Sequence, residues 1–181
     1  MQTILRITTL FISALVFAGC ASQATSIGMT PTSIQVSSHH NQSISLNING
    51  GVSTNPLSQS TVSNEEFQKA LEISIKNSGI FTSITNKEKS DLLLEVVIIN
   101  LGQPMAGIDM SVTFTANWKL YKENPDTPLQ PTIVWQDLIS TNYTATPSDS
   151  LIGIKRLRIA NEGAARENIK EGIRRLSIIK T

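Results

Sequence analysis

The chain of 181 residues contains one cysteine, two histidines and few aromatic residues, which make up 5% of the sequence. A single cysteine can form neither an internal disulfide nor a cysteine-based metal cluster. Charged residues are also sparse at 16%, and the formal net charge is +1, so the sequence lacks the basic footprint of a nucleic-acid-binding protein. Hydrophobic residues reach 40%, which is typical of one globular domain with an additional end segment.

The most apolar segment of the chain is short. It covers residues 10–18 with only Ser13 as a polar interruption, and it follows one positive charge at Arg6. A bilayer span needs about 20 apolar residues, so this segment is typical of an export signal and not of a membrane helix. We therefore predict that residues 1–19 are a signal peptide.

The only cysteine, Cys20, stands directly after this segment in the run Phe17-Ala18-Gly19-Cys20. The run resembles a bacterial lipobox, with Phe17 where the pattern usually has Leu or Val. The resemblance implies that Cys20 becomes the N-terminus and carries a covalent diacylglycerol and an N-acyl lipid such as palmitate; no other cofactor is expected. In the alternative, ordinary signal cleavage occurs near Ala21 and Cys20 is incidental.

The residue after Cys20 is Ala21 and not Asp. By the sorting rule of Gram-negative lipoproteins, which the same resemblance implies, this favours the outer membrane with the body of the protein facing the periplasm. Residues 20–32 are small and polar without a hydrophobic period, which predicts a lipidated flexible tether. We expect residues 33–181 to form a single periplasmic domain.

The domain is predicted to begin with two strands, because residues 33–38 and 43–48 alternate apolar and polar side chains. A helix follows after a loop. Ser63 and Glu66 have the spacing of a capping box at its start, and Gly79 occupies the position of a C-terminal glycine. The apolar residues between them share one helix face.

Three more strands are predicted in the second half of the chain. Residues 91–100 are an almost continuous apolar run typical of a central strand, residues 108–121 alternate strictly, and residues 132–143 complete a meander. A long helix over residues 150–178 closes the domain. Gly163 lies in its middle, where we favour close packing of the helix on the sheet over a partner site.

These elements predict an α+β domain with the element order β-β-α-β-β-β-α. The sheet is expected to be mixed and mostly antiparallel, with about five strands and with two helices packed on one face. Trp118 and Trp135 fall in the predicted strands and are expected in the core.

Three stretches carry a resemblance to a known family: residues 49–75, residues 103–113 and residues 142–169. They resemble a largely uncharacterised family of small envelope lipoproteins of Gram-negative, proteobacterial species, over about residues 45–178. More loosely, the pattern is similar to YajG-like and TolB N-terminal-like accessory lipoproteins. The looser resemblance implies a docking part without catalytic activity, whereas the closer family implies no biochemical role.

The sequence offers no recognisable catalytic or metal-binding motif, so we expect neither a catalytic residue nor a metal site. It contains no nucleophile-elbow, zinc-protease or phosphate-binding-loop pattern. Adjacent strand residues point to opposite faces, so His39 and His40 cannot bind one metal together, and we expect both to be exposed. The protein is therefore predicted to be non-enzymatic.

The long helix carries the most notable charge pattern in the chain. Basic residues outnumber acidic ones between positions 155 and 175. A solvated helix face is the simpler interpretation. The functional interpretation is a surface for an acidic partner or for anionic lipid head groups, formed by Lys155, Arg156, Arg158, Arg166, Arg174 and Arg175.

Three functions remain open at this point. The first is an anchored, non-enzymatic accessory or adaptor lipoprotein that docks a protein complex of the cell envelope and is held to the membrane by its lipid. The second is a protein that handles lipid or lipopolysaccharide in a pocket between the sheet and the long helix. The third is an envelope hydrolase, which would need a site that the sequence does not display.

Overall fold

The structure is a computed structural model that describes residues 23–52, 60–122 and 131–180. The predicted signal peptide over residues 1–19, the lipid attachment at Cys20 and the first residues of the predicted tether lie outside the described residues. They stay predictions.

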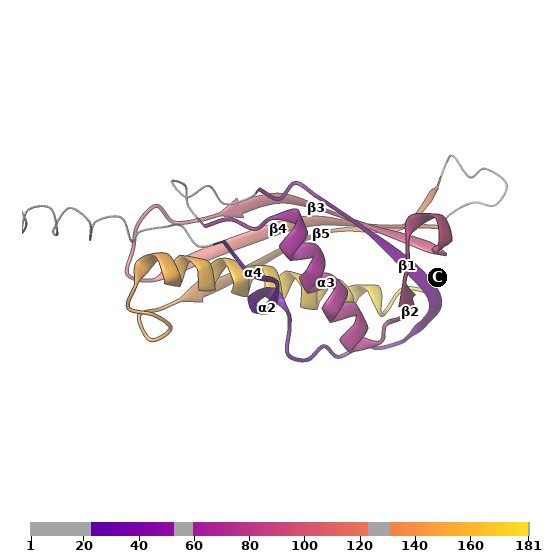
Figure 1. Cartoon of the computed structure of the whole chain (residues 1–181), viewed down its shortest axis with the longest axis horizontal. Helices are drawn as coiled ribbons and strands as arrows, with labels where there is room; N and C mark the ends of the chain where they lie inside the picture. Colours follow the sequence, from indigo (N-terminus) through magenta and orange to yellow (C-terminus); the bar gives the residue numbers. More distant parts are fainter. Residues whose placement is uncertain (1–22, 53–59, 123–130, 181) are drawn as a thin grey trace, which may run out of the picture.

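The domain is built on one five-stranded sheet with the strand order β2-β1-β3-β4-β5 (Figure 1). Strand β1 pairs in parallel with both β2 and β3, whereas β3–β4 and β4–β5 are antiparallel. The sheet is therefore mixed, and the predicted α+β class is confirmed. The strands are β1 (His40–Asn49), β2 (Phe81–Ile84), β3 (Leu92–Gly102), β4 (Met110–Lys122) and β5 (Thr132–Ala145).

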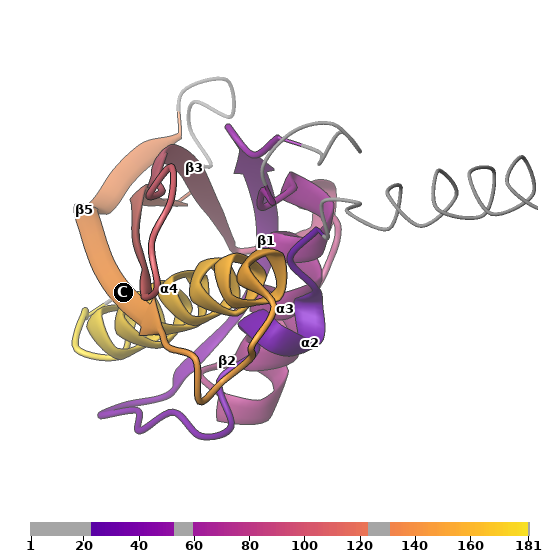
Figure 2. The same ribbon diagram turned by 90° about the vertical axis from the view of Figure 1, so that its left-hand side faces the viewer.

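The helices lie together on one face of the sheet, as predicted (Figures 1 and 2). The long helix α4 packs on β4 and β5, and the sheet curves around it (Figure 2). The opposite face of the sheet is covered by no described element. The helices are α2 (Ser26–Met29), α3 (Asn64–Ser78) and α4 (Gly153–Leu176), with a short 3₁₀ turn η2 (Lys87–Lys89) before β3.

Helix α3 forms where its end signals predict it. The Ser63 side chain accepts a hydrogen bond from the Glu66 backbone N–H at 3.3 Å, which satisfies one free donor of the first turn. At the other end Gly79 adopts φ 62°, a left-handed conformation that glycine reaches without a steric penalty. The Glu66 carboxylate does not complete the capping box; it accepts from the Ser26 backbone N–H of α2 at 2.8 Å.

The core lies between the sheet and the helices. The inward positions of β4 alternate with outward polar ones, and Trp118 among them is 0% exposed. Its indole Nε1 donates to Asn168 of α4 at 2.9 Å, and the Asn168 amide nitrogen donates to the Ile139 carbonyl of β5 at 2.9 Å. These bonds fix the helix against the middle of the sheet, because each buried polar group has a partner. The expectation that Trp118 belongs to the core is confirmed, and Trp135 is partly buried against it.

Two glycines allow α4 to approach the sheet closely. A Cβ atom on Gly163 would lie 2.2 Å from the Tyr143 ring, and one on Gly172 would lie 2.5 Å from the Trp118 ring. Real Cβ atoms do not come that close to other heavy atoms, so only glycine fits at these two positions. The predicted packing role of Gly163 is confirmed.

The predicted order of the elements is wrong at the start of the domain. Residues 33–38 form no strand; Ile34 and Val36 pack against the core, while the Ser37 backbone N–H donates to the Ser177 hydroxyl at 2.9 Å. The alternation of this segment reflects its packing beside the end of α4 and not a sheet neighbour. The fifth strand is instead β2, which sequence reasoning missed because it has only four residues.

The predicted flexible tether is also wrong for residues 23–32. Met29 of α2 is 0% exposed and Ala24 is 1% exposed, so this segment belongs to the core. Thr25 donates through its backbone N–H and its hydroxyl to one oxygen of Glu162, both at 2.9 Å. The small polar residues of this segment are typical of a flexible linker, which is why the sequence predicted one. In the structure they bond to carboxylates of α3 and α4 instead.

Candidate functional site

The basic residues predicted on α4 are not gathered into one open surface. Lys155 is exposed near the start of the helix, but Arg156 is only 9% exposed and its Nη1 donates to the Ser150 carbonyl at 2.7 Å. Arg158 lies 3.7 Å from Glu162, in an ion pair one helix turn apart. Substituting Arg156 would therefore perturb packing as well as surface charge.

The remaining predicted basic residues also make internal contacts. Arg166 donates to the Gly28 carbonyl of α2 at 2.8 Å and lies over the Tyr143 ring, 5.3 Å from its centre. Through these two contacts its guanidinium connects α4 to α2 on one side and to β5 on the other.

An ion-pair cluster closes the C-terminal end of α4. Arg174 and Arg175 both donate to Glu171 at 2.7 Å, and Arg175 also reaches Asp137 of β5 at 2.5 Å. The bond from Arg174, aided by Arg175, outweighs partial burial and lowers the pKa of Glu171 to about 2. Arg175 thus links the helix to the sheet, and the positive charges of both arginines are partly neutralised by these carboxylates.

The described residues contain no cluster of three histidine, cysteine or carboxylate side chains that could hold a metal ion. His39 is exposed, as expected, but the expectation for His40 is wrong. The His40 ring is 7% exposed, stacks on Phe81 and lies 3.0 Å from the Leu176 carbonyl. It is a packing residue at the start of β1. No helix among the described residues is both long and apolar enough to cross a membrane.

The most distinctive surface feature is the edge of β1 beyond the end of β2. The last backbone bond between the two strands runs from the Thr85 N–H to the Ile44 carbonyl at 2.9 Å. From residue 45 to residue 49, β1 pairs with β3 alone among the described strands. Backbone groups alternate in direction along a strand, so Leu46 points its N–H and C=O toward the same open side as Ile44.

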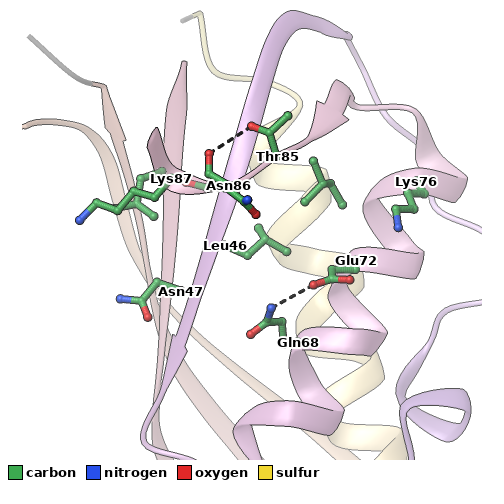
Figure 3. Close-up of a pocket in the computed structure, with 11 residues that line it drawn as sticks. Leu46, Asn47, Gln68, Glu72, Lys76, Thr85, Asn86 and Lys87 are labelled. Atoms are coloured by element: carbon green, nitrogen blue, oxygen red, sulfur yellow. Dashed lines mark hydrogen bonds between the residues drawn. The ribbon is translucent and has the colours of Figure 1, made fainter. Parts of the chain in front are cut away.

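A groove of about 560 Å³ lies along this open edge, between β1 and α3 (Figure 3). We call it the edge groove. Figure 3 shows Leu46 pointing from β1 toward α3, where it forms an apolar floor. The groove is lined by Ser45, Leu46, Asn47 and Leu93 from the sheet, by Gln68, Glu72 and Lys76 from α3, and by Ile84, Thr85, Asn86 and Lys87 from the segment after β2.

The polar wall of the edge groove is ordered by its own hydrogen bonds. Gln68 donates to Glu72 at 2.9 Å along α3, and the Thr85 hydroxyl donates to the Asn86 carbonyl at 3.4 Å (Figure 3). Lys76 and Lys87 are exposed at the rim. The arrangement offers an apolar floor, a backbone edge and a mostly positive rim, but no group of residues arranged for acid–base chemistry.

Sequence reasoning missed the edge groove. Its formation depends on the shortness of β2, since a longer strand would occupy the same side of β1. The one signal in the chain is the brevity of the apolar segment after Gly79, where only Ile80, Phe81 and Ile84 precede a polar stretch.

The interface proposed as a lipid pocket, between the sheet and α4, is filled by side chains. Trp118, Ile169 and Ile173 are each 0% exposed there, and Gly172 touches the Trp118 ring. The edge groove lies on α3 and not on α4, so it is not the pocket that the lipid-handling hypothesis requires.

No protein-family model matches the chain, and no curated protein matches it in sequence. Solved structures do share its fold. A Xanthomonas campestris protein of the DUF330 family is 12% identical, with a TM-score of 0.65 over 87% of this chain and 95% of its own. A hypothetical protein from Chlamydia trachomatis is 6% identical, with a TM-score of 0.56 over 76% of this chain and 96% of its own.

Proteins named as lipoproteins are also among the solved structures that resemble this one. Lipoprotein B from Nitrosomonas europaea is 11% identical, with a TM-score of 0.47 over 81% of this chain and 89% of its own. At these identities the similarities concern the fold alone.

Proposed function

We propose that this protein is a membrane-anchored, non-enzymatic accessory lipoprotein of the bacterial cell envelope, and that the edge groove docks an extended segment of a partner protein complex. One observation carries the docking role. From residue 45 onward β1 pairs only with β3 among the described strands, and the edge groove runs along the side of β1 that is left open. The lipobox-like run ending at Cys20 supports the anchor. Outer-membrane attachment facing the periplasm is part of the proposal, supported by Ala21.

An extended segment would bind the edge groove by adding a strand to the sheet. Neighbouring strands lie about 4.8 Å apart, and an added strand bonds to the free backbone groups of the edge. Leu46 offers both an N–H and a C=O on that side. Alternate side chains of the segment would contact Leu46 and Ile84 at the floor, which favours an apolar residue at every second position.

The charges around the edge groove add a preference. Lys76 and Lys87 stand at the rim, and among the described residues that line the groove Glu72 is the only carboxylate. A segment with acidic side chains beside its apolar positions fits this rim better than a basic one, because opposite charges speed encounter and suppress wrong partners.

Position-specific photo-crosslinking in living cells of the native host tests the docking role. A photoreactive amino acid replaces Glu72 inside the edge groove or, as the matched control, Ile73 on the exposed side of the same helix, where the side chain is 39% exposed. We expect one defined protein adduct from position 72 and at least tenfold less of it from position 73. With the photoreactive amino acid at Gln68, another lining residue of the groove, the groove-filling substitution Glu72→Trp should reduce the adduct, whereas its control Ile73→Trp should not.

The anchor is tested in the same cells. Mass spectrometry of the N-terminal peptide should show an acylated Cys20, and the Cys20→Ser variant should lose both the lipid and the membrane fraction. Equal adducts from positions 72 and 73, or an adduct from position 68 that Glu72→Trp leaves unchanged, would contradict docking in the edge groove.

A further inference from the structure

The end of the molecule at which α4 begins is unusually apolar. Met105 in the β3–β4 loop is 96% exposed and Leu151 just before α4 is 87% exposed, which makes them the two most exposed large hydrophobic side chains of the described residues. Ile108 is 75% exposed, Ile152 is 54% and Ile154 is 40%. We call these five residues the apolar end. Other large apolar side chains are exposed elsewhere, such as Ile27 at 84%, but these five lie on two segments of the chain, and exposed apolar side chains that gather together are typical of an interaction surface.

The two loops that carry these residues lie side by side. Figures 1 and 2 show the β3–β4 loop and the segment before α4 at the same end of the molecule. A short distance supports this placement: a Cβ on Gly153 would lie 3.8 Å from the terminal methyl of Met110. Met110 directly follows the β3–β4 loop and Gly153 directly follows the segment before α4, so the two segments end close together.

The chain leaves the folded body close to this end. Gln103, which begins the β3–β4 loop, donates to the Ser60 carbonyl at 2.6 Å, and the next residue, Thr61, accepts from the Ala24 backbone N–H at 3.1 Å. Gln23 is held as well, since its side chain donates to the Ser63 hydroxyl at 2.6 Å. The first fixed residue of the body is thus attached beside the loop that carries Met105.

The distance from Cys20 to the fixed body is correspondingly short. Two residues separate Cys20 from Gln23, and the three steps from Cys20 to Gln23 span at most about 11 Å when fully extended. Helix α4 has 24 residues and is about 36 Å long, and Thr25 is bonded to Glu162 in its first half. Glu162 lies about 14 Å along α4 from its start and about 21 Å from its end, so the attachment is nearer the end of the body that carries Leu151.

We propose that the apolar end inserts into the membrane surface, so that a three-residue leash at Cys20 and the side chains of Met105, Ile108 and Leu151 hold the domain in one orientation on the bilayer. This inference rests on the lipid anchor of the proposed function and adds a second point of membrane contact. Lys155, exposed in the first turn of α4, lies at the level of the lipid head groups in this orientation.

The orientation also places the proposed docking site. Strand β2 lies at the opposite end of the molecule from the apolar end (Figure 1), and residues after β2 line the edge groove. The groove therefore faces away from the membrane, where a partner in the periplasm reaches it without contacting lipid.

Fluorescence quenching in vesicles tests the inference with the full lipidated protein. Acylation occupies Cys20, so a single new cysteine carries an environment-sensitive dye: Met105→Cys, Leu151→Cys or, as the control on the exposed face of β2, Thr82→Cys. The vesicles contain phosphatidylethanolamine and phosphatidylglycerol, with or without a lipid that bears a spin-label quencher. We expect at least twofold quenching at positions 105 and 151 and none at position 82.

The outcomes separate this inference from the proposed function. Acylated protein that binds vesicles without quenching at positions 105 and 151, or with equal quenching at all three, overturns the orientation and leaves the edge groove untouched. If the mass of the Cys20 peptide shows no acyl chains, the lipid anchor is absent, and both the anchor of the proposed function and the orientation proposed here are overturned. A protein adduct formed from positions 105 and 151 in native envelopes, in place of lipid contact, would assign the apolar end to a protein partner and overturn the inference as well.

Discussion

The contact between Gly172 and Trp118 makes a quantitative prediction about how α4 packs. In an exposed helix, Gly→Ala stabilises by about 1 kcal/mol. At Gly172 the new Cβ would lie 2.5 Å from two ring atoms of a side chain that is 0% exposed, and overpacking of a filled core costs about 1–3 kcal/mol. Trp118 cannot move away without losing its bond to Asn168. We therefore expect Gly172→Ala to destabilise the domain by about 2 kcal/mol despite its better helix propensity.

Urea unfolding followed by tryptophan fluorescence measures this effect, and Gly153→Ala is the matched control. A Cβ at Gly153 would meet its nearest heavy atoms at 3.8 Å, which is ordinary contact. The control should therefore unfold at the same urea concentration as the parent or slightly higher. The Gly172 variant should lose roughly 4–8 °C in Tm as well. A Gly172→Ala protein as stable as the control would refute the close approach of α4 to the sheet.

Three further changes test other parts of the fold. Asn168→Ala strands the buried Trp118 N–H and the Ile139 carbonyl, so it should cost about 3 kcal/mol in urea unfolding; a loss below about 1 kcal/mol would contradict this role. Glu171 has a lowered pKa of about 2, so the stability from its ionised form is present above about pH 4.5 and is lost as the pH falls toward 2. Glu171→Gln should flatten the stability profile in that window by about 1 kcal/mol or less; an unchanged profile would argue against the pair. Deleting residues 23–32 should cost roughly 3 kcal/mol in thermal unfolding, because it uncovers apolar core surface, whereas a flexible tether would cost nothing.

Elements with strong local signals could be predicted from the sequence. The cap at Ser63 and the glycine at Gly79 locate α3, and strict alternation over residues 108–121 locates β4. These signals act within one element, so they do not depend on what the element packs against. The α+β class followed from them, since two amphipathic helices and a set of half-buried strands can bury their apolar faces in few ways.

Elements that depend on distant contacts could not be predicted. Residues 23–32 look like a linker until Thr25 meets Glu162 and Ser26 meets Glu66, bonds that join positions far apart in the chain. The four residues of β2 are too few for a period to show, yet their length decides where β1 becomes a free edge. The edge groove exists because β2 is short, and the shortness of a strand leaves no motif in the sequence.

The basic residues of α4 show the same limit at the level of function. Their sequence pattern allows either a solvated face or a binding surface, and the choice depends on the partner of each side chain. Arg166 and Arg175 bond to α2 and to β5, respectively. Lys155 alone of the six predicted residues is exposed beside the apolar end, so it is the one we retain for contact with head groups.

Amide hydrogen exchange at Leu46 tests the proposed docking role most directly. The measurement compares the lipoprotein alone with its complex with the partner that crosslinks from position 72. A segment added to the edge of β1 must accept a hydrogen bond from the Leu46 N–H, so we predict at least tenfold slower exchange there and no change at Gly107 in the β3–β4 loop. Unchanged exchange at Leu46, with protection instead on the open face of β4 and β5, would contradict docking in the edge groove.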